Sequence, residues 1–169
     1  IAAERLRSLD AAAVRLIAGA DTLFVASHNP DDDPRDTGGV DASHRGGRPG
    51  FVKVEGDVLT VPDYSGNFAF NTLGNLVVNP RAGLLFVDFD SGDLLMLTGR
   101  AEVLWDKADA VAAFRGAERA WRFTLDHGLR LRKASPLRWR FGAYSPDSLA
   151  TGDWGDAAQC AADGTPGGG

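Results

Sequence analysis

Two long runs of β-forming residues lie close together near the middle of the chain, and they limit the possible folds more than any other feature. The runs cover residues 83–89 and 94–105, and only the four residues 90–93, Asp-Ser-Gly-Asp, separate them. Aspartate, serine and glycine are typical of tight turns, so the two runs are predicted to fold back on each other as antiparallel neighbours.

Shorter segments on both sides add strands and helices to this pair. β-rich segments predict further strands at residues 22–27, 40–43, 51–54, 58–61, 119–131 and 135–144. Apolar residues at three- and four-residue spacing predict one or two short helices up to Gly19, and helices at residues 68–78 and 107–114. Asp10 is a candidate helix cap, Pro62 is expected to close a hairpin of residues 51–61, and Asn79-Pro80 is expected to end the central helix.

This order predicts a mainly β domain with helical insertions. Regular alternation of strands and helices is missing, which favours an antiparallel barrel over a doubly wound parallel sheet. The glycine fingerprint of dinucleotide-binding sheets and the Gly-Lys-Ser/Thr turn of nucleotide-binding loops are also missing from the sequence.

Composition narrows the class of protein. A chain of 169 residues with 44% hydrophobic residues is long enough for one domain, predicted over residues 1–150, while residues 151–169 are rich in Gly and Ala and are predicted to be a flexible tail. A net charge of −5 argues against nucleic-acid binding. The single cysteine, Cys160, excludes an internal disulfide and fits a cytoplasmic protein, and no apolar run approaches the roughly 20 residues of a membrane span.

A basic, glycine-rich segment at residues 43–50 is the first candidate binding site. Glycines let a backbone approach a ligand closely, and Arg45 and Arg48 can bind a phosphate or stack on a ring. A solvated surface turn explains the same residues equally well.

A second candidate is the polar turn at residues 64–67 followed by residues 71–75, Asn-Thr-Leu-Gly-Asn, at the start of the central helix. Free N–H groups at a helix entrance favour an anion, although an ordinary capped helix has similar residues. No metal site is expected, because His28, His44 and His127 lie far apart without paired acidic or cysteine ligands.

In order and spacing, these segments resemble a known family. Residues 79–86, Asn-Pro-Arg-Ala-Gly-Leu-Leu-Phe, followed by residues 98–104, Thr-Gly-Arg-Ala-Glu-Val-Leu, resemble the central part of the pyridoxamine 5'-phosphate oxidase family. Residues 45–51, 66–67 and 74–76 are similar to a branch of uncharacterised FMN-binding relatives. The resemblance implies a six-stranded antiparallel split β-barrel (the FMN-binding split barrel), and a homodimer with one FMN in each of two clefts at the subunit interface.

The resemblance also assigns roles by position. Asn67 matches the end of a Tyr-Thr-Asn turn, and Asn71 and Thr72 stand where the oxidases have an Arg-Lys pair that grips the FMN phosphate. Because that pair is replaced here, positive charge is expected from Arg45 first, then from Lys53 and Arg48. Four residues are then expected along the isoalloxazine or ribityl chain: Ser43, His44, Gly46 and Gly47.

The implied function is an FMN-dependent oxidoreductase that transfers two electrons through the flavin to an unknown substrate, with NAD(P)H or a small molecule as partner. His44 is the only candidate catalytic residue. The Arg-x-His pattern that holds the substrate in the oxidases is missing after residue 136, so oxidation of pyridoxamine phosphate itself is not expected. The alternatives are a non-catalytic protein that binds flavin, deazaflavin or haem in the same cleft, and an interaction module without a cofactor.

Overall fold

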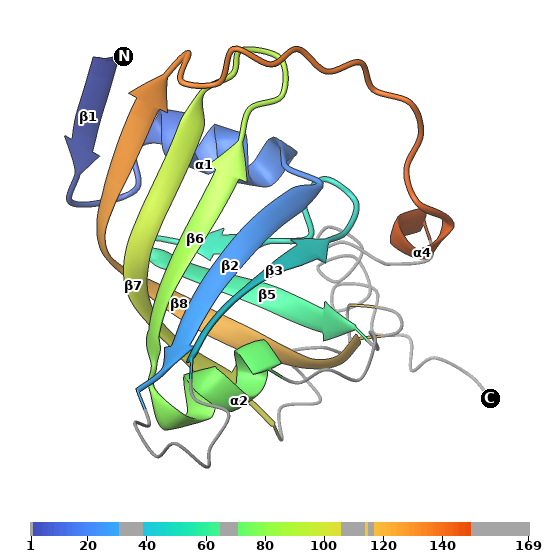
Figure 1. Cartoon of the computed structure of the whole chain (residues 1–169). Coiled ribbons are helices and arrows are strands. Elements are labelled where there is room, and N and C mark those ends of the chain that lie inside the picture. Colours follow the sequence, from blue (N-terminus) through green and yellow to red (C-terminus); the bar gives the residue numbers. More distant parts are fainter. Residues whose placement is uncertain (1, 31–38, 65–70, 106–113, 115–116, 150–169) are drawn as a thin grey trace.

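The computed structural model describes residues 2–30, 39–64, 71–105, 114 and 117–149, and Figure 1 shows their arrangement. Every strand pair in it is antiparallel. The strands lie in the order β3 (Gly39–Gly46), β2 (Thr22–Asn29), β6 (Arg81–Val87), β7 (Leu94–Leu104), β8 (Ala117–Arg132), β5 (Val58–Tyr64) and β4 (Lys53–Glu55), with β1 (Ala2–Leu6) also paired to β8.

The sheet curls into a split barrel, with β3 and β4 at the two ends of the strand order. In Figure 1, β5 crosses behind β2 and β6, because the long strand β8 bends and carries β5 round to the far side. The bend coincides with a bulge between Thr98 and Gly99 in the β7–β8 pairing. A side chain at Gly99 would lie 2.1 Å from the carbonyl oxygen of Thr124, so only glycine allows this close approach of the two strands.

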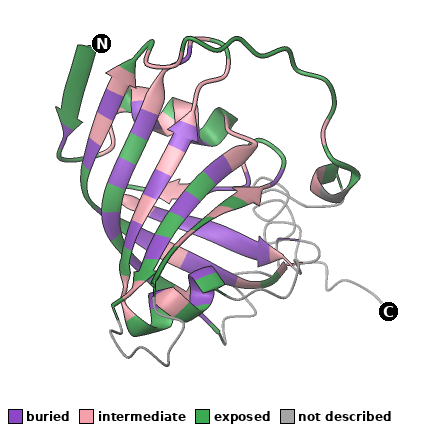
Figure 2. Cartoon of the chain, in the orientation of Figure 1, coloured by how far each residue is buried: buried purple, intermediate pink, exposed green. Residues whose placement is uncertain are grey.

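Alternation along the strands produces the core. Inward residues of β2, β6 and β7 are buried and their neighbours are not, which is the striped pattern of Figure 2. Helix α1 (Ala11–Gly19) adds Ala13 and Ile17 to the core, and helix α2 (Asn71–Val78) adds Leu73 and Leu76. The helices therefore cover openings of the barrel that the strands leave.

The fold class predicted from sequence is confirmed, with eight strands in the described residues instead of the six expected. The central antiparallel hairpin is β6–β7, and the second predicted hairpin is β4–β5. Asp10 caps α1 by accepting a hydrogen bond from the backbone N–H of Ala13 at 2.8 Å. Helix α2 ends at Val78, immediately before Asn79-Pro80.

Three local predictions were wrong. Residues 2–6 form a strand and not a helix, because they pair with the end of β8. Pro62 does not end β5, which continues to Tyr64; Pro62 lies beyond the part of β5 that pairs with β4, so its missing N–H breaks no bond on that side. Residues 135–144 pair with no strand and run as an extended segment over one end of the barrel to a short helix, α4 (Pro146–Leu149), as Figure 1 shows.

Two predictions lie outside the described residues: the helix at 107–114, apart from Phe114, and the tail at 151–169. Within the described residues, the helices are all too short or too polar to traverse a lipid bilayer.

Candidate functional site

Strand β3 divides the predicted binding residues between the two faces of the sheet. Ser43 and Arg45 lie opposite the buried residues Val25 and Leu23 of β2, so they point toward the inside of the barrel. His44 lies on the outer face, exposed, with its ring centroid 6.0 Å from that of Phe24. Ser43 and His44 were expected along the same part of the flavin, and the structure places them on opposite sides of one strand.

The inner face of β3 meets helix α2, so the two predicted segments are in contact. The Ser43 and Thr72 hydroxyl oxygens are 2.7 Å apart, and Thr72 donates a hydrogen bond of 2.5 Å to Asp41 Oδ2. Asp41 was not singled out from the sequence, although it precedes Ser43 by two residues and must share its face. Asn71 is exposed at the start of α2, and Asn67 lies outside the described residues.

The direction of these hydrogen bonds determines what the junction of β3 and α2 can bind. A hydroxyl has one proton, and that of Thr72 points to the carboxylate of Asp41. Thr72 must therefore accept from Ser43, so both protons are used within the protein. A phosphate needs donors and repels a carboxylate, so these side chains do not fit the phosphate group that was expected here.

Arg45 fits a phosphate better. Its Nη1 donates to the carbonyl oxygen of His44 at 3.0 Å, while its Nε is buried without a hydrogen-bond acceptor among the described residues. The nearest carboxylate oxygen is Asp63 Oδ1, 3.7 Å from Nε, which is too far for a hydrogen bond. A buried donor without an acceptor is the kind of group that a bound anion satisfies.

Asp63 is shared between two arginines. Arg119 Nε lies 3.8 Å from its second oxygen, and the Arg119 guanidinium also pairs with Glu118 and lies 5.5 Å from the centroid of the Trp105 ring. Burial raises the pKa of Asp63, and the two guanidiniums reduce this effect without cancelling it. Neither Asp63 nor Arg119 belongs to a recognisable motif, so the sequence did not indicate them.

The remaining predicted residues have internal contacts. Lys53 Nζ is 3.0 Å from Glu55 Oε1 on the exposed strand β4. At Gly47 an added Cβ would lie 2.6 Å from Cβ of Phe51, and at Gly46 it would lie 2.9 Å from the ring of His44. Gly47 is thus required by packing against the buried Phe51, whereas the exposed His44 ring could move away from a side chain at position 46.

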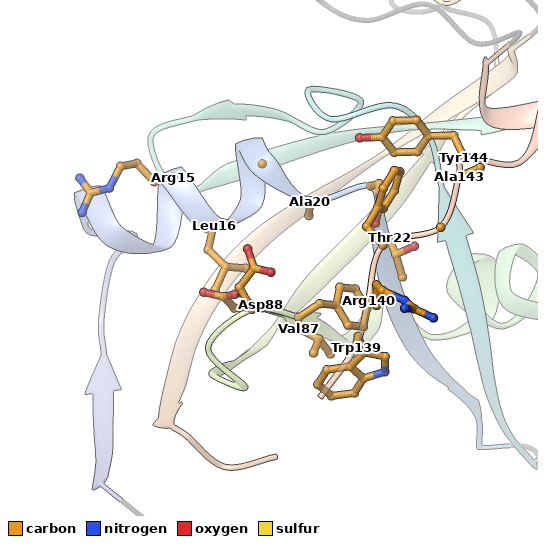
Figure 3. Close-up of a pocket in the computed structure, with 16 residues that line it drawn as sticks. Arg15, Leu16, Ala20, Thr22, Val87, Asp88, Trp139, Arg140, Ala143 and Tyr144 are labelled. Atoms are coloured by element: carbon orange, nitrogen blue, oxygen red, sulfur yellow. Dashed lines mark hydrogen bonds between the residues drawn. The ribbon is translucent and has the colours of Figure 1, made fainter. Parts of the chain in front are cut away.

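A cavity of about 690 Å³ lies beside this glycine segment, between the end of α1 and the extended segment 139–144 (Figure 3). Asp21 and Thr22 line the cavity and also contact the glycine segment. The Gly47 N–H donates to the Asp21 carbonyl at 3.1 Å, and Thr22 Oγ1 is 3.2 Å from His44 Nε2.

Aromatic rings line much of this cavity, in two contacting pairs. The centroids of Phe89 and Trp139 are 5.1 Å apart, and those of Phe141 and Tyr144 are 4.9 Å apart. Figure 3 shows the Arg15 side chain pointing away from Asp88 and from the lining residues near it. These four rings line the cavity together with charged and polar residues, and its volume is large enough for a small organic molecule.

The outer face of the sheet carries a row of apolar residues. Strand register places Phe24, Leu85, Met96 and Leu129 side by side across β2, β6, β7 and β8. Phe24 is 40% exposed and Met96 is 44% exposed. His44 lies at the β3 end of this row, opposite Phe24.

Among the described residues, His, Cys, Asp and Glu side chains form no cluster of three that could hold a metal ion.

Comparison with known proteins identifies the family. The family model for pyridoxamine 5'-phosphate oxidase matches residues 9–138, which is more than half of the chain. No curated protein matches the sequence significantly.

Three solved structures share the fold at low sequence identity. A putative pyridoxamine 5'-phosphate oxidase from Lactobacillus delbrueckii is 15% identical with a TM-score of 0.56, over 72% of this chain and 93% of that one. A variant of HupZ from Group A Streptococcus is 13% identical with a TM-score of 0.55, over 72% and 98%. A protein from Clostridium acetobutylicum related to general stress protein 26 of B. subtilis is 17% identical with a TM-score of 0.53, over 77% and 92%. The chain belongs to the pyridoxamine 5'-phosphate oxidase family and has an antiparallel split-barrel fold of the kind seen in these relatives.

Proposed function

We propose that this protein is an FMN-binding oxidoreductase that works as a homodimer, with the flavin at the subunit interface. Family membership supports the flavin. The observation that carries the choice of FMN is the buried Nε of Arg45, which has no acceptor in the described part of the chain and would find one in a phosphate. When bound, the flavin supplies two-electron chemistry at its N5, and the protein holds and orients it.

In this proposal Arg45 binds the phosphate and Asp63 holds the guanidinium in place. The ion pair of 3.7 Å is loose enough for the guanidinium to turn toward a ligand without leaving Asp63. The side chain of Arg45 is 22% exposed, so a ligand can reach the guanidinium from solvent, and a turn of the guanidinium would bring the buried Nε to it. The α2 residues Asn71 and Thr72 then do not supply the phosphate contacts that their position in the family suggests.

The apolar row on the outer face supports the homodimer. Large apolar side chains in a continuous row on a sheet face are typical of a surface that another protein covers. A second copy on this face would bring His44 to the rim of the interface. Because β3 is the edge strand, a flavin whose phosphate is held by Arg45 on the inner side would extend round this edge to the interface, which keeps His44 as the candidate catalytic residue. The neighbouring aromatic cavity would receive the small-molecule substrate or NAD(P)H.

An absorption spectrum of the purified protein tests the proposed function. We expect a yellow protein with one FMN per chain, whose flavin bands bleach when NADH or NADPH is added. Flavin that binds but is never reduced would indicate a binding protein, and a Soret band would indicate haem. A colourless protein that does not take up added FMN would contradict the proposal.

Light scattering tests the homodimer. We expect the mass of two chains for the native protein and of one chain for Met96→Lys, because a charge in the middle of the row is costly to bury. Val78→Lys is the matched control, since Val78 is exposed on α2, away from the row. A dimer that persists in Met96→Lys would place the interface elsewhere.

A further inference from the structure

The carboxylate at the junction of β3 and α2 is not explained by packing alone. Asp41 is half-buried, and within the described part of the chain it forms no ion pair. Its described contact is with the hydroxyl of Thr72, which is 3% exposed. Asp41 thus lies beside the positions where the family's phosphate-gripping pair would stand. A carboxylate there without a countercharge must influence which ligands can approach.

We infer that Asp41 is a specificity-determining residue, which excludes a phosphate from the junction of β3 and α2 and leaves that junction to uncharged hydrogen-bond donors. The inference rests on the proposed flavin site. It adds that different residues bind different parts of the ligand. Arg45 binds the phosphate, and the junction of β3 and α2 contacts the uncharged part.

The first step of the inference is the direction of the hydroxyl chain. Ser43 donates to Thr72, and Thr72 donates to Asp41, so no hydroxyl proton remains for a ligand. The Ser43 and Asp41 oxygens retain lone pairs, and both residues are partly exposed. The junction can therefore accept hydrogen bonds but not donate them through these side chains, which suits hydroxyl and N–H groups such as those of a ribityl chain.

The second step is charge. A phosphate monoester carries between one and two negative charges at neutral pH, and its repulsion by a carboxylate is strongest where water is partly excluded. Arg45 lies four residues after Asp41 on the same face of β3, but its guanidinium is directed to Asp63. Asp41 is thus the nearer and uncompensated charge at the junction.

The experiment compares affinities for FMN and riboflavin, measured by quenching of flavin fluorescence on the full chain. Asp41→Ala removes the charge and releases the Thr72 proton, so we expect FMN to gain about tenfold in affinity relative to riboflavin, as for one charged hydrogen bond. Asp41→Asn removes the charge but keeps an acceptor for Thr72, and a smaller gain is expected. Asp126→Ala, an exposed residue on β8, is the control for net charge and should leave the ratio unchanged.

A double variant separates the hydroxyl chain from charge. Adding Thr72→Val to Asp41→Ala should cancel the part of the gain that comes from the released proton and leave the part that comes from the lost charge. An unchanged ratio in Asp41→Ala, or a gain that disappears completely in the double variant, would overturn exclusion by charge. Melting curves confirm that each variant is folded before its affinities are compared.

Binding of inorganic phosphate tests the role of Asp41 without the flavin. We expect phosphate to raise the melting temperature of Asp41→Ala more than that of the native protein. If no form binds either flavin, the proposed function fails, yet a phosphate effect confined to the Asp41 variants would still support the role of Asp41. Equal phosphate effects in both forms would overturn it.

Discussion

Two arginines in this protein differ in how closely they bind their carboxylate partners. Arg130 on β8 is 4% exposed and donates to two carboxylates, with Nη1 2.8 Å from Glu4 Oε2 and Nη2 2.5 Å from Asp10 Oδ1. Arg45 on β3 has only the looser ion pair with Asp63, at 3.7 Å, and its buried Nε has no hydrogen bond among the described residues.

The difference separates a structural from a ligand-binding arginine. Arg130 connects three elements, β1, the N-terminal cap of α1 and β8, and its donors are used for that purpose. Arg45 connects β3 to β5 through Asp63 and retains a donor. A guanidinium that is saturated by the protein stabilises the fold, while one that is incompletely satisfied has binding capacity left for an anion.

The largest expected effect is on ligand affinity at Arg45. Arg45→Ala should weaken FMN binding by about 1.5 to 3 kcal/mol, the range for a charged hydrogen bond, while riboflavin binding changes less. Fluorescence titration measures both. Arg122→Ala is the control, because Arg122 on β8 is partly exposed and pairs with Glu102 on β7. Equal losses for FMN and riboflavin would remove Arg45 from the phosphate site.

Replacing Arg130 should lower stability without changing flavin affinity. Arg130→Met keeps much of the side-chain volume but removes two charged hydrogen bonds, so we expect a loss of about 2 kcal/mol in the free energy of unfolding. Its two carboxylate partners are about half exposed and can regain water, which limits the loss. Urea unfolding measures the change, and unaltered stability would contradict the structural role.

The contributions of Asp63 and Asp10 to stability should change with pH in opposite directions. Burial raises the pKa of Asp63 above 3.8, so its contribution to stability is present below that value and is lost as pH rises through the folded-state pKa. The hydrogen bond from Arg130 lowers the pKa of Asp10, so its contribution is present above 3.8 and is lost as pH falls through the folded-state pKa.

Unfolding free energies measured from about pH 3 to 7 test this contrast. Relative to the native protein, Asp63→Asn should become more stable as pH rises, and Asp10→Asn should become less stable. Asparagine retains the cap of α1 in the second variant, so the comparison isolates charge. Slopes of the same sign for both variants would contradict the assigned environments.

The smallest effect is expected at Lys53. Its pair with Glu55 is exposed on a short edge strand, so Lys53→Ala should change stability and FMN affinity by less than about 0.5 kcal/mol. The same titration and urea experiments apply. A loss as large as that of Arg45→Ala would restore Lys53 to the phosphate site.

The predicted features that proved correct are local ones. The β6–β7 hairpin and the Asp10 cap each depend on residues within a few positions of one another, and the sequence was sufficient to place them. Residues 2–6 resemble a helix locally and became a strand because their partners are at residues 128–132. Residues 135–144 have a β-like composition but pair with none of the described strands, which the local sequence does not reveal.

Within the site, the contact between the glycine segment and α2 was predicted, but its chemistry was not. Strand β3 was expected to stop at Ser43 and continues to Gly46, so alternation carries His44 to the outer face. Asp41 and Asp63 belong to no motif, and each became important only through a partner from another element.

Residue order along the chain was enough for the antiparallel barrel, the main hairpins and the family, because turns, caps and strand alternation act over short distances. The tertiary structure alone decided which charged and polar groups meet, with Asp41 beside Thr72 and Asp63 between Arg45 and Arg119. Ionic and hydrogen-bond partners are chosen by distance in space, and these pairs lie 18 to 56 residues apart in the sequence. The spacings from 41 to 72, from 45 to 63 and from 63 to 119 follow no local pattern.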